Sequence, residues 1–242
     1  MFNHITRISS SAAGKAVPRR DLIAGGSLIA AGGLFVSKAA AQVASQVPDT
    51  PPLNPEMVKQ LVSKSHADLD TVRDLAKKEP MLVRASWDWG NGDWETGLGA
   101  ASHMGRRDIA RFLIDSGARI DVFAVFMLGE MSPAKALLTA FPDIHKTPGP
   151  HGIPLLSHTI IGKKESFDVF QMLIAAGADV NASAWRGGTP LMMAVASDQV
   201  DMLRILLEKG ANRAAKSSNG MTALDFAKKK NATEMVALLE KG

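Results

Sequence analysis

The feature that most constrains this chain is a sequence pattern that returns at a fixed interval. Thr189-Pro190-Leu191 and Ala194 recur one interval later as Thr222-Ala223-Leu224 and Ala227. The same frame is found upstream, in residues 96–118 and 153–181, and two degenerate copies end near Pro80 and Pro142. We count six copies over residues 55–242. The interval is about 33 residues, within the range of about 20 to 50 residues that is typical of tandem units that stack on one another.

Each copy carries apolar residues at the three- and four-residue spacing of a helix that is apolar on one face. Examples are Ile109, Phe112 and Leu113 in one copy and Met202, Ile205 and Leu206 in another. Such helix pairs bury their apolar faces only against neighbouring pairs. Glycines follow the second helix of three copies, where a left-handed residue can end a helix; they are Gly117, Gly177 and Gly210. The sequence therefore predicts an all-α solenoid of about six helix pairs, with the first and third degenerate.

The repeated unit resembles the ankyrin repeat. The likeness lies in Thr189-Pro190-Leu191 with Ala194, in the paired apolar residues of the second helix, and in Gly177-Ala178-Asp179. The resemblance implies an ankyrin-repeat α-solenoid that is not an enzyme and binds a protein partner through its concave groove and finger loops. It implies no cofactor.

Residues 1–41 have the order of an export signal, with basic residues, then an apolar run, then small residues. Pro18-Arg19-Arg20-Asp21-Leu22-Ile23 resembles the twin-arginine signal of bacteria. Leu22 to Ser37 is uncharged but shorter than the roughly 20 residues that span a bilayer. We expect cleavage after Ala41 and a periplasmic protein without a membrane segment after cleavage. An ordinary secretory signal and an uncleaved anchor are the alternatives.

Residues 42–54 are rich in proline and predict an extended linker ahead of a repeat domain at residues 55–242. Asn54 before Pro55 predicts the start of the first helix. Residues 1–41 hold five of the 28 Lys and Arg and one of the 24 Asp and Glu, which leaves 23 of each sign beyond them. A balanced body has no field that draws in nucleic acid, so we expect no nucleic-acid partner.

Two segments depart from the repeat frame. Residues 84–94 form a long finger with three of the four tryptophans and an Asn-Gly pair suited to a tight turn. Residues 145–152 are too rich in Pro and Gly for a helix or strand interior and predict an ordered loop.

Candidate partner-binding residues occupy the finger tips and the groove-facing ends of the first helices. Trp and Arg most often anchor protein interfaces because they bury large areas or make forked hydrogen bonds. The alternative for any single tryptophan is that it packs inward to support the finger. The predicted contacts are Trp87, Trp89, Asp93, Glu95, His66, His103, Met104, Trp185 and Arg186.

A second hypothesis, from a different class, is a metal or small-molecule site built from histidines. Ser65-His66 and Ser102-His103 fall in the same frame of the first two copies, which places two imidazoles on adjacent first helices. The axes of packed helices lie about 8–10 Å apart, so these two alone cannot share a metal and further ligands are required. The full candidate set is His66, His103, His145, His151 and His158.

The sequence contains no recognisable catalytic motif. The chain has no Cys, which excludes disulfides and thiolate chemistry, and no His-Glu-x-x-His sequence that would indicate a zinc enzyme. The Gly97–Ser102 segment is rich in glycine, but it lies where the first helix of a repeat is expected and not after a strand. We therefore expect no catalytic residues. A third hypothesis is an inhibitor or maturation partner of an exported enzyme.

Overall fold

The computed structural model describes residues 52–241, which belong to a compact unit of residues 52–242. The predicted signal of residues 1–41, including Arg19 and Arg20, and linker residues 42–51 lie outside the described residues. Within residues 52–241, no helix is both long enough and apolar enough to cross a membrane.

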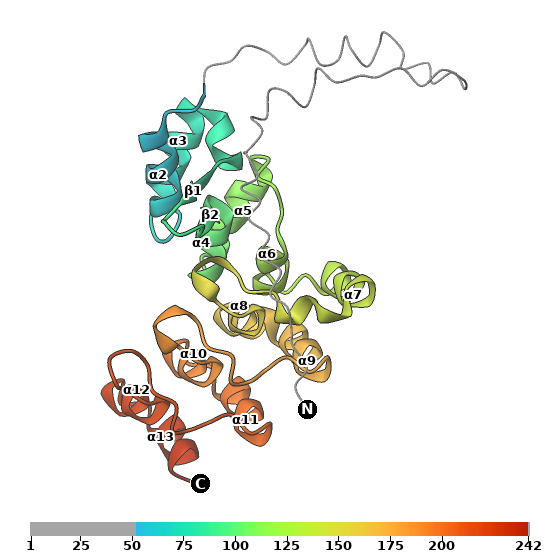
Figure 1. The fold of residues 1–242 in the computed structure, drawn as a ribbon, viewed down its shortest axis with the longest axis vertical. Helices are drawn as coiled ribbons and strands as arrows, with labels where there is room; N and C mark the ends of the chain where they lie inside the picture. Colours follow the sequence, from blue (N-terminus) through green and yellow to red (C-terminus); the bar gives the residue numbers. More distant parts are fainter. Residues whose placement is uncertain (1–51, 242) are drawn as a thin grey trace, which may run out of the picture. The chain divides into compact units, whose positions relative to one another are not determined.

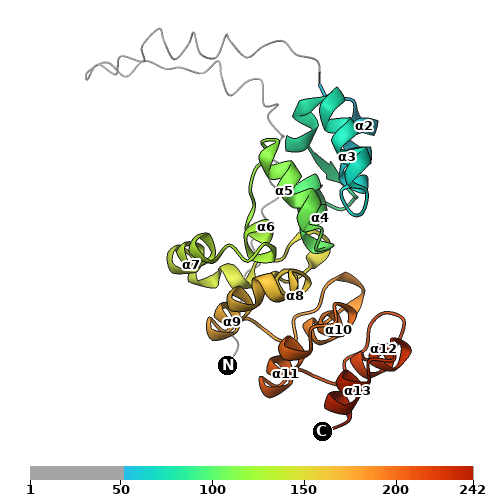
Figure 2. The ribbon, with the colours of Figure 1, turned by 180° about the vertical axis from the view of Figure 1, so that it is seen from behind.

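Six helix pairs follow one another along the described chain, as the repeat period predicts (Figures 1 and 2). The first helices of successive pairs contact one another, and so do several of the second helices. The pairs are α2 (Pro55–Lys64) with α3 (Leu69–Lys78), α4 (Gly97–His103) with α5 (Arg107–Asp115), α6 (Val122–Met127) with α7 (Met131–Ala140), α8 (Leu155–Ile161) with α9 (Phe167–Ala175), α10 (Pro190–Ala196) with α11 (Val200–Glu208), and α12 (Ala223–Lys229) with α13 (Thr233–Glu240). The predicted all-α solenoid is confirmed.

Local signals in the sequence set the ends of several helices. The Asn54 side chain accepts hydrogen bonds from the main-chain N–H of Glu56, at 2.9 Å, and of Met57, and so caps α2. Helix α3 ends two residues before Pro80, where a 3₁₀ turn begins (Pro80–Arg84), and α7 ends two residues before Pro142, where another begins (Pro142–Lys146). Gly117, Gly177 and Gly210 all have a positive φ after a second helix, as predicted for left-handed caps.

The apolar core runs through the stack in two clusters that meet at α6. Ala124 and Met127 belong to the cluster of the first three pairs, whereas Val125 and Phe126 belong to the cluster of the last four. All four side chains are buried. Because α6 faces both neighbours at once, removing it would leave two open apolar surfaces.

Long basic side chains add polar links between pairs. The Arg107 guanidinium donates to the carbonyls of Met127 and Leu128 at the end of α6, at 2.9 and 3.0 Å. Lys230 donates to the carbonyls of Val195 and Ala196 at the end of α10. A cation at the carboxyl end of a helix satisfies unpaired carbonyls and opposes the negative end of the helix dipole. Each contact ties one pair to the next.

The finger and the loop take distinct forms. Strands β1 (Ser86–Asp88) and β2 (Trp94–Thr96) pair antiparallel as a hairpin, with Trp87 opposite Glu95. Asn91 and Gly92 at its tip have a positive φ, as the Asn-Gly pair predicts. The loop contains two 3₁₀ turns, Pro142–Lys146 and Pro150–Gly152, and Pro148 bridges to Pro154.

Two glycines with similar backbones provide a test of how tightly the pairs pack. Gly129 has φ +72°, and a Cβ added there would lie 2.0 Å from the main-chain oxygen of Glu165. Gly177 has φ +86°, and a Cβ added there would meet nothing within 4 Å. We expect Gly177→Ala to lower the free energy of unfolding by about 1–2 kcal/mol through left-handed strain alone. Gly129→Ala adds a main-chain clash and should lower it by about 2–5 kcal/mol.

Urea unfolding followed by circular dichroism measures both changes against the unsubstituted chain. Equal losses in the two variants would show that the α6 and α8 pairs do not approach as closely as described.

Candidate functional site

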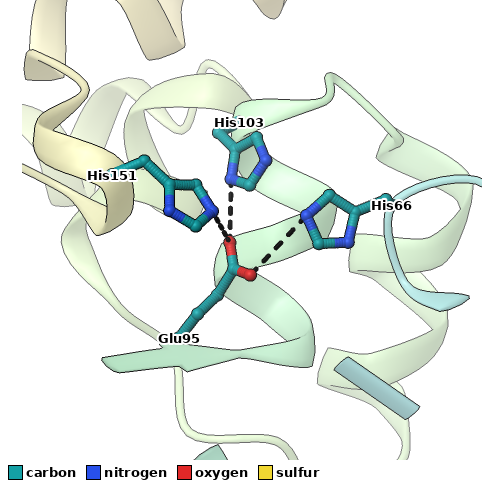
Figure 3. Close-up of side chains that lie close together, drawn as sticks. All are labelled: His66, Glu95, His103 and His151. Carbon is teal, nitrogen blue, oxygen red and sulfur yellow. Dashed lines mark ion pairs between the residues drawn. The ribbon is translucent and has the colours of Figure 1, made fainter. Parts of the chain in front are cut away.

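Three histidines surround one buried carboxylate near the hairpin (Figure 3). Glu95 Oε1 lies 3.0 Å from His103 Nδ1 and 3.6 Å from His151 Nε2. Glu95 Oε2 lies 3.6 Å from His66 Nε2. One ligand atom from each of these four side chains can be chosen so that all lie within 4.8 Å of one another. We call these four residues the His–Glu cluster.

Four separate segments bring the His–Glu cluster together. His66 follows α2, His103 is the last residue of α4, Glu95 is the central residue of β2, and His151 lies in the loop before α8. Strand alternation turns Glu95 inward, where its exposed fraction is 1%, and Trp94 outward, where it is 59%. The His66 and His103 rings meet edge to face with centroids 4.9 Å apart, so their side chains close the gap between helix axes.

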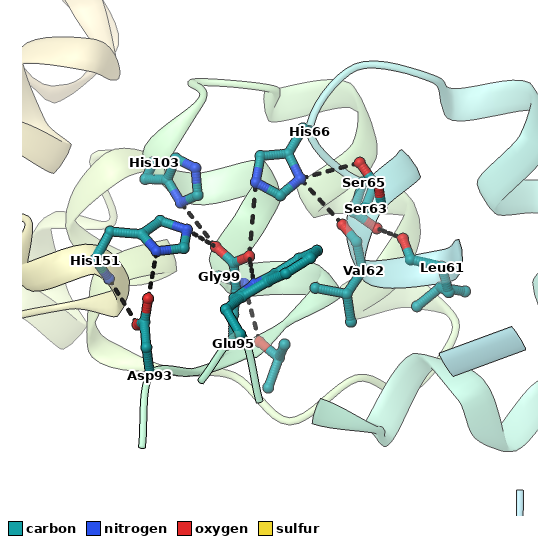
Figure 4. A network of polar contacts seen from close by, with 12 residues as sticks. Leu61, Val62, Ser63, Ser65, His66, Asp93, Glu95, Gly99, His103 and His151 are labelled. Atoms are coloured by element: carbon teal, nitrogen blue, oxygen red, sulfur yellow. Dashed lines mark hydrogen bonds and ion pairs between the residues drawn. The ribbon is translucent and has the colours of Figure 1, made fainter. Parts of the chain in front are cut away.

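Asp93 holds His151 in place (Figure 4). Its carboxylate accepts the main-chain N–H of His151 at 2.9 Å and lies 2.6 Å from the ring Nδ1. Burial would raise the pKa of Asp93, but these contacts with His151 outweigh it and the pKa is lowered. The ionised carboxylate only accepts hydrogen bonds, so the ring proton of His151 sits on Nδ1.

His66 is oriented by the main chain. Its Nδ1 lies 3.1 Å from the carbonyl oxygen of Val62 and 3.0 Å from that of Ser63 (Figure 4). Carbonyl oxygens only accept, so Nδ1 of His66 carries a proton and donates to them. The other ring nitrogen, Nε2, lies on the side of Glu95.

Glu95 is fixed by the finger itself. The indole Nε1–H of Trp89 donates to Glu95 Oε2 at 2.8 Å. Glu95 Oε1 and His103 Nδ1 are buried and, although 3.0 Å apart, do not meet in hydrogen-bond geometry. Among residues 52–241, the ion-pair partners of Glu95 are histidines alone, without a Lys or Arg. A buried carboxylate is stabilised by a compensating cation, and in this cluster a protonated histidine or a bound metal ion can take that role.

The other two candidate histidines are not members of the His–Glu cluster. His158 is fully buried and its ring packs on Phe123 at a centroid distance of 4.8 Å. Burial, with a smaller contribution from His103, lowers the pKa of His158 to about 3, so the ring is neutral. His145 Nδ1 contacts the carbonyl of Pro142 at 2.9 Å. The structure therefore gathers His66, His103 and His151 from the predicted set, but not His145 or His158.

Two of the residues predicted to contact a partner, Glu95 and His103, are buried, which corrects the expectation that they face a partner. Glu95 is 1% and His103 is 7% exposed, because both turn into the His–Glu cluster. His66 and Asp93 are partly buried and contact cluster residues. Sequence reasoning missed Glu95 as the centre of the cluster and Asp93 as its support; strand alternation in the hairpin was the signal that could have found Glu95.

The remaining predicted contacts differ in exposure. Trp89 is 37% and Met104 is 50% exposed, and Arg186 is exposed in the 3₁₀ turn Trp185–Gly187. Trp87 is half-buried against the core, with Lys59 Nζ 5.6 Å from its ring centroid. The side chain of Trp185 lies outside the described part of the structure. Partner binding by these residues stays a prediction.

An open pocket of about 650 Å³ borders the cluster. It is lined by the hairpin tip from Trp89 to Asp93 and by His151 and Gly152. His151 thus belongs both to the pocket wall and to the His–Glu cluster.

The hydrogen bond from Trp89 to Glu95 can be tested with a matched pair of variants. Trp89→Phe keeps an aromatic ring but removes the N–H donor to a buried carboxylate. We expect the free energy of unfolding to fall by about 1.5–3 kcal/mol. Trp94→Phe, at an exposed position of the same hairpin, should change it by less than about 0.5 kcal/mol. Urea titration compares the two, and similar effects would argue against the buried hydrogen bond.

Part of this chain is similar in sequence to known repeat proteins. Residues 158–242 match the family model described as ankyrin repeats (3 copies). The chain is 33% identical over 75 residues to the human Ankyrin repeat and SOCS box protein 11, and 36% identical over 74 residues to the putative ankyrin repeat protein FPV219 of fowlpox virus (strain NVSL). These matches cover 31% and 30% of this chain but only 23% and 17% of the relatives. Residues 158–242 are therefore similar to ankyrin repeats, and the described chain is an all-α repeat solenoid.

Proposed function

We propose that this chain is an exported, non-enzymatic interaction module that binds a protein partner through its concave groove and finger loops. Ankyrin repeats are in general protein-binding modules, which supports the class of function but not the identity of the partner. The partner we propose is another exported protein.

The observation that carries this proposal is the exposed apolar surface of the hairpin and of the adjoining end of α4. Trp94 is 59%, Met104 is 50% and Trp89 is 37% exposed. Large aromatic and Met side chains are enriched in protein interfaces because they bury much area on binding. A short hairpin would ordinarily be mobile, but here Glu95 and Asp93 anchor it to three histidines. A finger that is already ordered loses less conformational entropy when a partner binds.

Charge supports a protein partner over a nucleic acid. The 23 basic and 23 acidic residues after residue 41 leave no net charge on the body. Strong binding to a phosphate backbone needs a basic excess, whereas a protein interface can be built from apolar contacts with a polar rim.

The interface can be tested by alanine substitution at exposed positions outside the His–Glu cluster. The triple variant Trp94→Ala, Met104→Ala and Arg186→Ala should retain the fold but capture the partner at least about tenfold less well, since hot-spot side chains each contribute about 1 kcal/mol or more. The assay is quantitative mass spectrometry of proteins retained from the periplasm of the native host.

The matched control is Phe141→Ala. Phe141 is 62% exposed but follows α7, a second helix, away from the fingers. The Phe141→Ala variant should capture the same protein as the unsubstituted chain. Equal capture by the triple variant would exclude the groove and the fingers as the binding surface.

Export is proposed from the leader. In the native host, replacing Arg19 and Arg20 together by Lys should abolish export by the twin-arginine route, because that signal depends on the paired arginines. Cell fractionation and immunoblotting measure the location. Unchanged export would indicate an ordinary secretory signal, and an unprocessed chain in the membrane fraction would indicate an anchor.

A further inference from the structure

We propose that His66, Glu95, His103 and His151 form a binding site for one divalent transition-metal ion of the zinc type. This inference goes beyond the proposed protein-binding function and does not depend on it. Its support comes from the distances, the hydrogen bonds and the charge of the His–Glu cluster.

The distances fit a four-coordinate site after small side-chain movements. A tetrahedral ion with ligand bonds of about 2.0–2.1 Å holds neighbouring ligand atoms about 3.3 Å apart. In the cluster, Glu95 Oε1 lies 3.0 Å from His103 Nδ1 and 3.6 Å from His151 Nε2, and Glu95 Oε2 lies 3.6 Å from His66 Nε2. With one ligand atom taken from each side chain, all four atoms lie within 4.8 Å of one another. Figure 3 shows the three rings directed at the one carboxylate from different sides.

The hydrogen bonds set two rings in the form that a metal requires. Metal-bound histidines usually donate their second N–H to a carboxylate or a carbonyl oxygen, which fixes the tautomer and the ring orientation. His151 makes this contact with Asp93 at 2.6 Å, and His66 makes it with the carbonyls of Val62 and Ser63. In both rings Nδ1 makes the outer contact, so Nε2 is the nitrogen that would bind the metal ion, and it is Nε2 that faces Glu95.

The contact between His103 and Glu95 is better explained by a shared ion than by a hydrogen bond. Nδ1 and Oε1 are 3.0 Å apart and buried, yet their geometry does not direct a ring N–H at the oxygen. Two ligand atoms of one metal ion are likewise close together without a hydrogen bond between them. The ion would also compensate the charge of Glu95, a buried carboxylate whose ion-pair partners among residues 52–241 are histidines alone.

The set of ligand atoms determines which ions fit. Three imidazole nitrogens and one carboxylate oxygen suit Zn²⁺, Co²⁺, Ni²⁺ or Cu²⁺, whereas Mg²⁺ and Ca²⁺ prefer sites made of oxygen atoms alone. All four positions are filled by protein side chains, which is typical of structural zinc sites rather than catalytic ones. The side chains of His66 and His151 are 26% and 22% exposed, so two of the four ligands can be reached from solvent.

Such an ion would add a further link between the first two helix pairs, the hairpin and the loop before α8. His66 belongs to the first helix pair, Glu95 and His103 to the second, and His151 to the loop that leads into the fourth. Since metal binding to the folded chain adds to its stability, the ion would fasten the hairpin and this loop together.

The test is titration of the full chain, freed of metal by a chelator, with Zn²⁺ in an isothermal calorimeter. We expect one ion per chain with a dissociation constant below about 1 µM. His103→Ala should weaken binding by about 100-fold or more, and Asp93→Ala, which removes the acceptor that orients His151, by about 10- to 100-fold. His145→Ala, at a histidine outside the cluster, is the matched control and should bind Zn²⁺ as the unsubstituted chain does.

A second readout separates ligand loss from misfolding. Glu95→Gln keeps the shape of the side chain, and circular dichroism reports whether this variant folds. Co²⁺ bound to the unsubstituted chain should give the intense visible bands of a four-coordinate site, and Zn²⁺ should raise the midpoint of urea unfolding; both effects should be lost in Glu95→Gln. Absence of saturable binding, or binding that is equal in His103→Ala and weakened only by His145→Ala, would overturn the proposal. The partner-capture assay uses other residues, so failure of one proposal leaves the other standing.

Discussion

The structure depends on the burial of one apolar face of each helix pair against the next pair. The helices have only six to ten residues, which is too short for independent stability in water, so packing between pairs supplies what length does not. Helix α6 shows this most clearly, because Ala124 and Met127 pack toward one neighbour while Val125 and Phe126 pack toward the other. Arg107 and Lys230 each donate hydrogen bonds to helix-end carbonyls of a neighbouring pair, and these directional contacts add to the apolar packing.

The His–Glu cluster adds polar contacts between several helix pairs to this apolar packing. It joins residues 66 and 151, which are far apart in the sequence, through a hairpin inserted between the first and second pairs. A solenoid unfolds locally at the boundaries between its units. A polar cluster that spans several units resists such opening at the hairpin, and the same hairpin presents Trp89 and Trp94 at the surface. Rigidity of the finger and exposure of its aromatic side chains therefore have one structural origin.

The fold could be predicted from the sequence because its signals are local. The repeat period, Asn54 before Pro55, and the glycines after the second helices are all legible without knowledge of distant contacts. The site could be predicted only in part. The shared frame of His66 and His103 indicated that the two rings lie on adjacent helices, but nothing local distinguished His151 from His145 or His158. Glu95 was placed at the surface because a finger residue is usually exposed; alternation in β2 instead turns it inward.

The sequence by itself determined the repeat architecture, the helix boundaries, the hairpin turn at Asn91-Gly92 and the balance of charge on the body. These depend on periodicity, capping and turn chemistry, which act over short distances along the chain. Only the tertiary structure decided that Asp93 supports His151, that Trp89 holds Glu95, and that three histidines meet at one carboxylate. Those contacts depend on where the irregular loop before α8 lies relative to the hairpin. Packing between distant segments decides that position, and these segments share no sequence pattern that would predict it.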